Sequence, residues 1–185
     1  MAISHLEQLS EDNLIDIFYG DESGFSSEGY VPYGWQFKEE DVCVLAKRGY
    51  KFNVFGLISR DNRCIWSMTE KSINADFVID IIEKHSLSIQ KPTIIMLDNA
   101  KLHKGMKMKE RIPIWEKRNL FIFFLPSYSP ELNIAETLWR VMKGKWIRPE
   151  DYIEKDALAY AINRCLSNVG NELNINFKPY NHDGK

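Results

Sequence analysis

Two short apolar runs joined by a helix-length segment stand out in the middle of the chain. The first run, residues 92–97, ends at Asp98, and the second covers residues 120–125. Continuous apolar runs of this length are typical of strands buried on both faces, so the segment between them predicts a βαβ unit with parallel strands. Ligands gather at the carboxyl ends of such strands. The pattern therefore predicts a functional edge at Asp98.

The remaining pattern predicts further strands and helices around this unit. Residues 15–20 alternate like a strand and lead into Asp21, and residues 50–59 and 64–69 predict a hairpin. A Gly-, Ser- and aromatic-rich loop is expected at 26–41, with a short added strand at 42–46. Helices are expected in three segments, 74–86, 134–147 and 152–169. This order predicts an α/β fold with a mixed five-stranded sheet flanked by helices.

Composition restricts the class of protein. A chain of 185 residues with 44% hydrophobic side chains can bury one sizeable core and is not disordered. The predicted organisation is an N-terminal linker or short helix at 1–14, one domain at 15–170 and a loose tail at 171–185. No apolar run approaches the roughly 18 residues that span a membrane, and no signal peptide is evident. Three cysteines without CxxC spacing predict reduced core thiols in the cytoplasm.

The net charge of −2 hides an uneven distribution. Residues 1–41 carry ten acidic side chains and a single basic one, Lys38, whereas basic side chains gather at 101–118 and 140–148. Such runs are often the solvated faces of helices. Beside a cluster of carboxylates they can instead form a basic rim that holds the phosphates of a polyanion.

Three acidic residues are candidates for a shared metal site. Asp21 is expected at the end of the first strand, Asp98 at the end of the fourth and Glu136 in the helix after the fifth. Carboxylate oxygens are the ligands that Mg²⁺ prefers, and paired ions assist phosphodiester cleavage. Each acid also has a structural interpretation: Asp98 as a turn residue, Asp21 as a loop start and Glu136 as part of a capping box with Asn133. Spacing alone leaves both interpretations open.

Two other side chains have the same double interpretation. His103, five residues after Asp98, can orient a phosphate or a catalytic carboxylate, or simply hydrogen-bond within the fold. Trp35, in the Gly-rich loop, can stack on a base or pack in the core.

Three sequence blocks stand out at residues 21–25, 98–103 and 125–139, and the last reads LPSYSPELNIAETLW. They resemble the catalytic blocks of mariner-like insertion-sequence transposases of the DDE superfamily. The resemblance implies a ribonuclease-H-like catalytic domain with Asp21, Asp98 and Glu136 as the metal-binding triad. It further implies two Mg²⁺ ions, which Mn²⁺ can replace, hydrolytic cleavage of transposon-end DNA, and attack of the freed 3′-hydroxyl on target DNA.

The resemblance also implies double-stranded DNA as the partner, a homodimer in the synaptic complex, and action in the prokaryotic cytoplasm without a membrane. The candidate DNA-contacting residues are mostly basic: Trp35, Lys101, His103, Lys104, Lys107, Lys109, Arg140 and Lys143.

The chain departs from the family pattern in three ways. Ile134 replaces the proline that usually begins the helix carrying the third acid, and 37 residues separate Asp98 from Glu136, a few more than usual. Residues 1–14 leave no room for the helix-turn-helix domains that recognise transposon ends. We therefore expect a separate chain to supply end recognition, or a truncated product. Two alternatives remain: a metal-dependent nuclease of the same fold without strand transfer, and a non-catalytic transposon-derived DNA-binding module.

Overall fold

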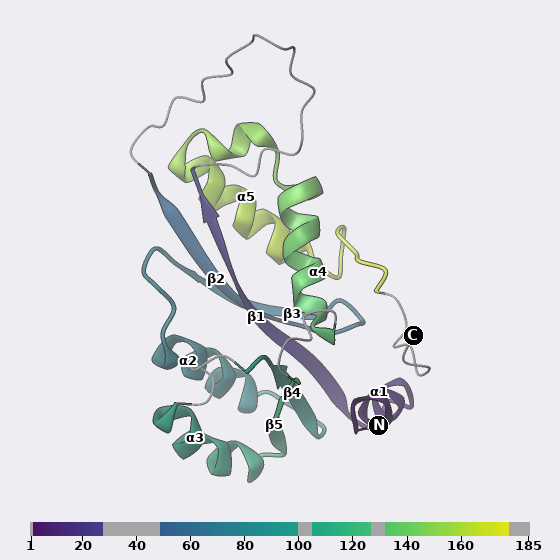
Figure 1. Ribbon diagram of the computed structural model, residues 1–185. Coiled ribbons are helices and arrows are strands. Elements are labelled where there is room, and N and C mark those ends of the chain that lie inside the picture. The colour runs from purple at the N-terminus through teal and green to yellow at the C-terminus, as the bar shows by residue number, and fades with distance from the viewer. Residues whose placement is uncertain (1, 28–48, 100–104, 127–131, 178–185) are drawn as a thin grey trace.

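A five-stranded mixed sheet forms the centre of the protein (Figure 1). The computed structural model describes residues 2–27, 49–99, 105–126 and 132–177. The strands lie in the order β3-β2-β1-β4-β5 and have the bounds β1 Asp16–Ser26, β2 Lys51–Ile58, β3 Cys64–Thr69, β4 Thr93–Leu97 and β5 Leu120–Phe124. β2 runs antiparallel to β1 and to β3, whereas β4 runs parallel to β1 and to β5. The predicted α/β fold with a mixed five-stranded sheet is confirmed.

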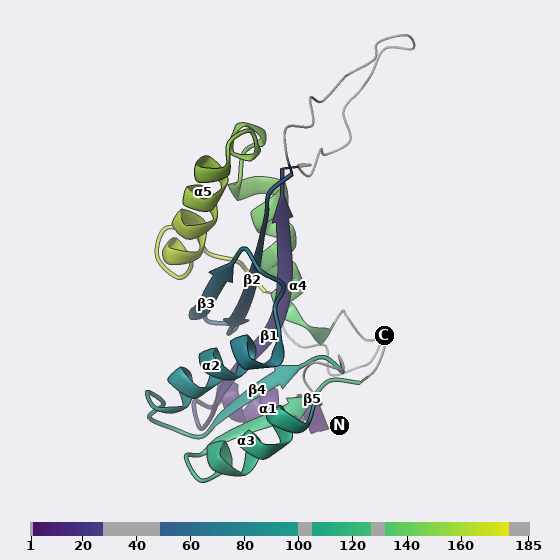
Figure 2. The same ribbon diagram turned by 90° about the vertical axis from the view of Figure 1, so that its left-hand side faces the viewer.

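Helices cover both faces of this sheet (Figures 1 and 2). Their bounds are α1 Ala2–Glu11, α2 Ala75–Ser86, α3 Met106–Glu116, α4 Ile134–Val141 and α5 Lys155–Asn168. A π-helical turn, Met142–Trp146, continues α4, and a 3₁₀ turn, Pro149–Tyr152, precedes α5. One buried cluster joins the sheet to α2 and α3, and a second joins its other face to α1, α4 and α5. None of the helices in the described ranges is long and apolar enough to cross a membrane.

β1 is the strand that brings the two halves of the sheet together. It has 11 residues, pairs with β4 from Asp16 to Tyr19 and with β2 from Tyr19 to Ser26. The sequence predicted a strand that ended before Asp21, and this boundary was wrong. The polar residues after Gly20 resemble a loop start, but β2 supplies the backbone partners that keep them in an extended strand. Asp21 therefore lies in mid-strand, just past the point where pairing with β4 stops.

α1 is joined to the sheet by a buried carboxylate. Glu7 is only 2% exposed, accepts a hydrogen bond from the Tyr19 hydroxyl and pairs with Arg60, whose Nε lies 2.9 Å from Oε2. A buried charge without such partners would lower the free energy of unfolding by on the order of several kcal/mol. The predicted short N-terminal helix is thus a docked element of the fold.

One carboxylate of α2, Glu83, binds several side chains of the basic helix α3 and of the turn that follows it. Glu83 accepts hydrogen bonds from Arg111 Nη2 at 2.5 Å, from Trp115 Nε1 at 2.9 Å and from Arg118 Nη1 at 2.7 Å. The hydrogen bond from Arg118, together with those from Trp115 and Arg111, lowers the pKa of Glu83 to about 2. Arg111 and Arg118, two of the basic residues in 101–118, therefore stabilise the contact with α2.

Glu83→Gln should lower the free energy of unfolding by about 1–2 kcal/mol at neutral pH, because two guanidinium groups lose their counter-charge. Because the pKa of Glu83 is lowered on folding, its carboxylate stabilises the protein fully above the ordinary value of 4.5, and this contribution disappears as the pH falls towards about 2. Denaturant unfolding of both proteins from pH 7 to pH 2.5 measures the difference. A gap between them that stays constant over this range would contradict the assignment.

Candidate active site

Asp21 and Asp98 belong to the same face of the sheet. Side chains alternate between the two faces along a strand, and Tyr19 and Met96 both pack in the cluster formed with α4. These two residues are paired across β1 and β4, and each lies two positions before one of the acids. Continuing this register sets Asp21 beside Asp98, on the face covered by α4. Asp98 is exposed and Asp21 is partly buried.

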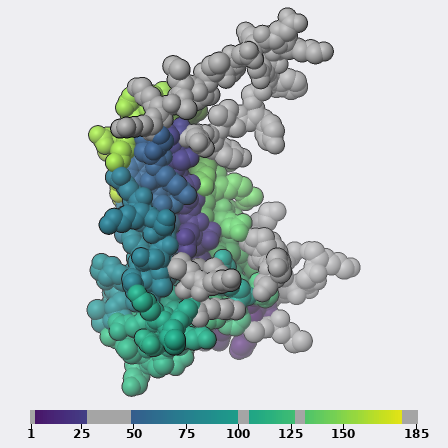
Figure 3. Space-filling model, turned by 60° about the vertical axis from the view of Figure 1, so that its left-hand side comes forward, coloured from purple at the N-terminus to yellow at the C-terminus, as the bar shows by residue number. Residues whose placement is uncertain are grey.

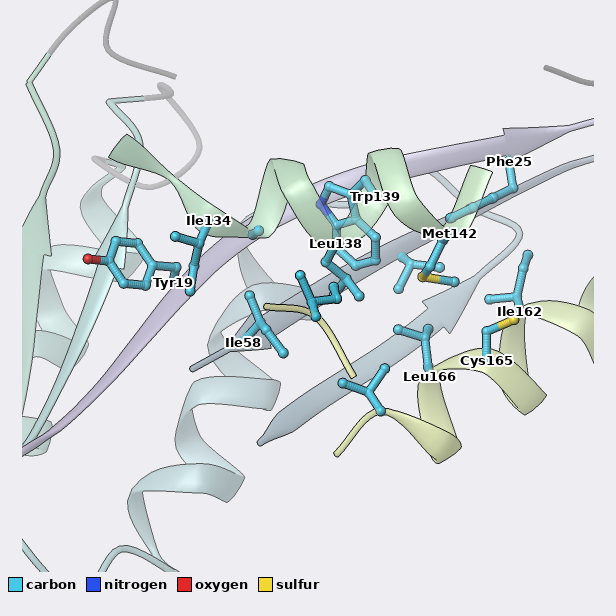
Figure 4. Close-up of a cluster of buried hydrophobic side chains, with 14 of the residues drawn as sticks. Tyr19, Phe25, Ile58, Ile134, Leu138, Trp139, Met142, Ile162, Cys165 and Leu166 are labelled. Atoms are coloured by element: carbon cyan, nitrogen blue, oxygen red, sulfur yellow. The ribbon is translucent and has the colours of Figure 1, made fainter. Parts of the chain in front are cut away.

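Glu136 comes from the first turn of α4, on that same face. The helix begins after Asn133, whose side chain accepts a hydrogen bond from the backbone N–H of Ala135 at 3.1 Å. The side of α4 facing the sheet is apolar, with Leu138 and Trp139 in the core (Figure 4). Ala135 belongs to the same buried cluster. Glu136 is exposed, as expected of an acid at a helix N-terminus, where the helix dipole favours negative charge.

The close approach of α4 to the sheet depends on a glycine opposite a tryptophan. A Cβ atom added to Gly56 in β2 would lie 2.8 Å from Cη2 of Trp139, so only a residue without a side chain fits there. The Trp139 ring also meets the Phe25 ring edge-on, with centroids 6.4 Å apart. The contact between Trp139 and Phe25 fixes the distance between α4 and β1, the strand that carries Asp21.

The three carboxylates interact electrostatically. The pKa of Asp21 is raised to about 6, mainly by burial and additionally by the negative charges of Asp98, Glu136 and Glu22, while a hydrogen bond with the Glu22 backbone opposes the rise. The structure therefore brings the three predicted acids within range of one another, although they are distant in sequence. Among the described residues, however, no group of three or more His, Cys, Asp or Glu side chains is already arranged to hold a metal ion.

Lys143 contributes a positive charge near Asp21. It lies in the π-helical turn after α4, two turns beyond Glu136, and its Nζ is 5.1 Å from the centre of the Phe25 ring. Burial lowers the pKa of Lys143, and the carboxylate of Asp21 opposes that effect. β1, purple in Figure 3, reaches the surface between the blue of β2 and the green of α4. Lys143 and Asp21 are both partly buried.

Two asparagines connect the backbone segments that carry the acids. Asn99, next to Asp98, donates a hydrogen bond from its side chain to the carbonyl of Leu125, and Leu125 N–H donates to Leu97 O at 2.8 Å. Asn133 donates from Nδ2 to the carbonyl of Gly20 at 3.1 Å. Sequence reasoning identified Asn133 only as a helix cap and anticipated neither long-range hydrogen bond, because neither partner has a local signal.

The predicted DNA-contacting residues differ in where they lie and in which side chains they contact. Trp35, Lys101, His103 and Lys104 lie outside the described residues. Lys107 pairs with Asp76 in α2, with Nζ 2.6 Å from Oδ2. Lys109 is exposed, and Arg140 is exposed and donates to Thr137 Oγ1 at 3.4 Å. The described members therefore lie in two separate groups, one on α3 and one on α4 with the turn that follows it.

The strand order and the covering helices define a fold of the ribonuclease-H-like class, and comparisons with known proteins agree. Among solved structures, the fold resembles the Mos1 transposase paired-end complex with left transposon end, with a TM-score of 0.62 at 15% identity. It also resembles the Mos1 mariner paired end complex with Mn, with a TM-score of 0.60 at 16% identity. Each comparison covers 89% of this chain and 52% of the solved chain. The chain thus spans about half the length of those transposase chains.

Residues 16–159 match the family described as DDE superfamily endonuclease, and the chain belongs to this family. The predicted superfamily is therefore confirmed. A curated relative, the uncharacterized protein y4pE/y4sA of Sinorhizobium fredii (strain NBRC 101917 / NGR234), is 37% identical over 54 residues. That stretch makes up 29% of this chain and 36% of the relative.

Proposed function

We propose that this chain is the catalytic domain of a cut-and-paste transposase. It would cleave transposon-end DNA by hydrolysis and join the freed 3′-hydroxyl to target DNA, with Asp21, Asp98 and Glu136 as the catalytic triad. The observation that supports this most strongly is the register of β1 and β4, which sets Asp21 beside Asp98 on the sheet face covered by α4, the helix that carries Glu136. The family match over residues 16–159 supports the same reaction class.

The donor chemistry of the three side chains suits a hard divalent cation. Asp21, Asp98 and Glu136 offer only carboxylate oxygens, and a partly buried aspartate near two like charges is best stabilised by a cation. Two Mg²⁺ ions, replaceable by Mn²⁺, would supply Lewis-acid activation of the attacking oxygen and of the leaving oxygen. Asp21 and Asp98 would hold their oxygens from adjacent strands, and Glu136 would close the site from α4.

Double-stranded DNA is the proposed partner, at transposon ends and at the target. Lys143 would hold a phosphate beside the acids, with its ammonium steadied by the Phe25 ring. One of the solved Mos1 structures is a paired-end complex with a transposon end, which supports a homodimer of this chain in a synaptic complex. End recognition by a separate chain or domain, and action on DNA in the prokaryotic cytoplasm, belong to the same proposal.

The test of the proposed function uses purified protein, Mg²⁺ or Mn²⁺, and DNA that carries the ends of the transposon in which this chain would be encoded. Nicked or cut ends are expected, followed by joined products in which a 3′-hydroxyl is linked to target DNA. Cleavage without joined products would support a metal-dependent nuclease of the same fold. An absence of both, with folded protein that binds DNA, would support the non-catalytic DNA-binding module.

Lys143→Gln should weaken DNA binding and reduce the slope of log affinity against log salt by about one, because one phosphate contact is lost. Lys107→Gln is the matched control, since its ammonium is already paired with Asp76 and should contribute less. Fluorescence anisotropy at several salt concentrations measures both slopes. Equal slopes for wild type and Lys143→Gln would place the DNA away from α4.

A further inference from the structure

Asn133 uses both ends of its side-chain amide, and its two partners flank the proposed active site. Oδ1 accepts from the N–H of Ala135 at 3.1 Å, and Nδ2 donates to the carbonyl of Gly20 at 3.1 Å. The residue is 5% exposed. A helix cap needs only the acceptor, and Asn74 at the start of α2 is an exposed example, accepting from Phe77 N–H at 3.0 Å. The hydrogen bond from Asn133 Nδ2 to Gly20 is therefore not required for capping the helix.

The two partners of this amide are each one residue away from an acid. Gly20 precedes Asp21 in β1, and Ala135 precedes Glu136 in α4. Adjacent Cα atoms are about 3.8 Å apart, so an amide that holds both partners also limits the separation of the two acid-bearing backbones. The backbone of Glu136 is held as well, because its N–H donates to the carbonyl of Asn133 at 3.2 Å.

The β1 end of this link cannot easily shift. A Cβ atom at Gly20 would lie 2.6 Å from Cδ2 of Leu97 and 3.0 Å from Cδ2 of Leu57, so packing blocks movement toward the α2 and α3 face. Gly20 is also paired with Leu57 in the β1–β2 ladder. The carbonyl of Gly20 is thus a fixed point against which the first turn of α4 is placed.

We propose that Asn133 is a positioning residue that sets the location of Glu136 relative to Asp21. The inference rests on the proposed function, because it assumes that these two acids share a cation. Its side chain would not touch the cation or the DNA. Among short side chains that cap helices well, only asparagine carries an acceptor for Ala135 N–H together with an amide donor for Gly20 O. Serine and aspartate cap a helix as well as asparagine does but lack that donor.

The test compares Asn133→Ser with Asn74→Ser as the matched control, because both substitutions keep a good helix cap. The readout besides cleavage is Mn²⁺ binding in the absence of DNA. Electron paramagnetic resonance of the free ion measures this binding. The Mn²⁺ dissociation constant of Asn133→Ser should rise by about 10- to 100-fold, as for other residues that orient metal ligands. The cleavage rate should fall in parallel. Asn74→Ser should match the wild type in both measurements.

The outcomes separate this inference from the proposed function. Wild-type Mn²⁺ affinity and cleavage rate in Asn133→Ser would overturn the positioning role while leaving the triad in place. Wild-type protein that neither binds Mn²⁺ nor cleaves DNA would overturn both. If Asn133→Ser does not fold, Asn133→Asp serves instead, since it keeps the acceptor and the shape. Failure of both variants to fold would reject the positioning role in favour of a requirement for folding.

Discussion

Asp98→Asn and Glu136→Gln are each expected to reduce metal-dependent DNA cleavage to below about one thousandth of the wild-type rate. Each substitution removes a charged oxygen ligand while keeping nearly the same shape. Both side chains are exposed, so the fold and its thermal unfolding should change little. Single-turnover cleavage of an end-containing DNA duplex, at saturating Mg²⁺ and again at saturating Mn²⁺, measures the effect.

Glu22→Gln is the control for this experiment. Glu22 is adjacent to Asp21 and equally acidic, but alternation along β1 turns it to the opposite face of the sheet. The control should cleave at close to the wild-type rate. Retained cleavage in both triad variants, or an equal loss in Glu22→Gln, would reject the assignment of Asp98 and Glu136.

Trp139→Ala is expected to have the largest effect on stability, lowering the free energy of unfolding by about 3–5 kcal/mol. The indole is 5% exposed and fills the space that Gly56 leaves in the sheet, so its loss creates a cavity between α4 and β2. For a domain of this size the melting temperature should fall by about 10 °C. Calorimetry or circular dichroism measures the shift.

Trp139→Phe provides the comparison, because a smaller ring should retain part of the packing against Phe25 and lose less stability. Cleavage by Trp139→Ala should be weakened even at temperatures where the variant is folded, since α4 also carries Glu136. A destabilisation below about 1 kcal/mol in Trp139→Ala would contradict the close packing of α4 on the sheet.

The sequence predicted the parts of the fold that have a local signal. The apolar runs at 92–97 and 120–125 became β4 and β5, and the basic segment between them became α3. The extent of β1 could not be predicted, because Asp21 and its polar neighbours stay extended only through pairing with β2. That pairing depends on residues more than thirty positions further along the chain.

The role of Asp21, Asp98 and Glu136 as the catalytic triad stays a prediction. The three motif blocks indicated these acids, and the negative charges of Asp98 and Glu136 act on Asp21 in the structure. The amide link from Asn133 to Gly20 joins residues 113 positions apart, so no local pattern could indicate it. The pairing of Lys107 with Asp76 was missed for the same reason, because α2 and α3 are separate in sequence and adjacent only in the fold.

Anomalous scattering from crystals soaked in Mn²⁺ shows whether the three acids share a cation. Density is expected between the carboxylates of Asp21, Asp98 and Glu136, with Glu136 turned inward from its exposed position. Manganese bound elsewhere in a crystal, with no density among these three side chains at saturating concentration, would contradict a shared cation.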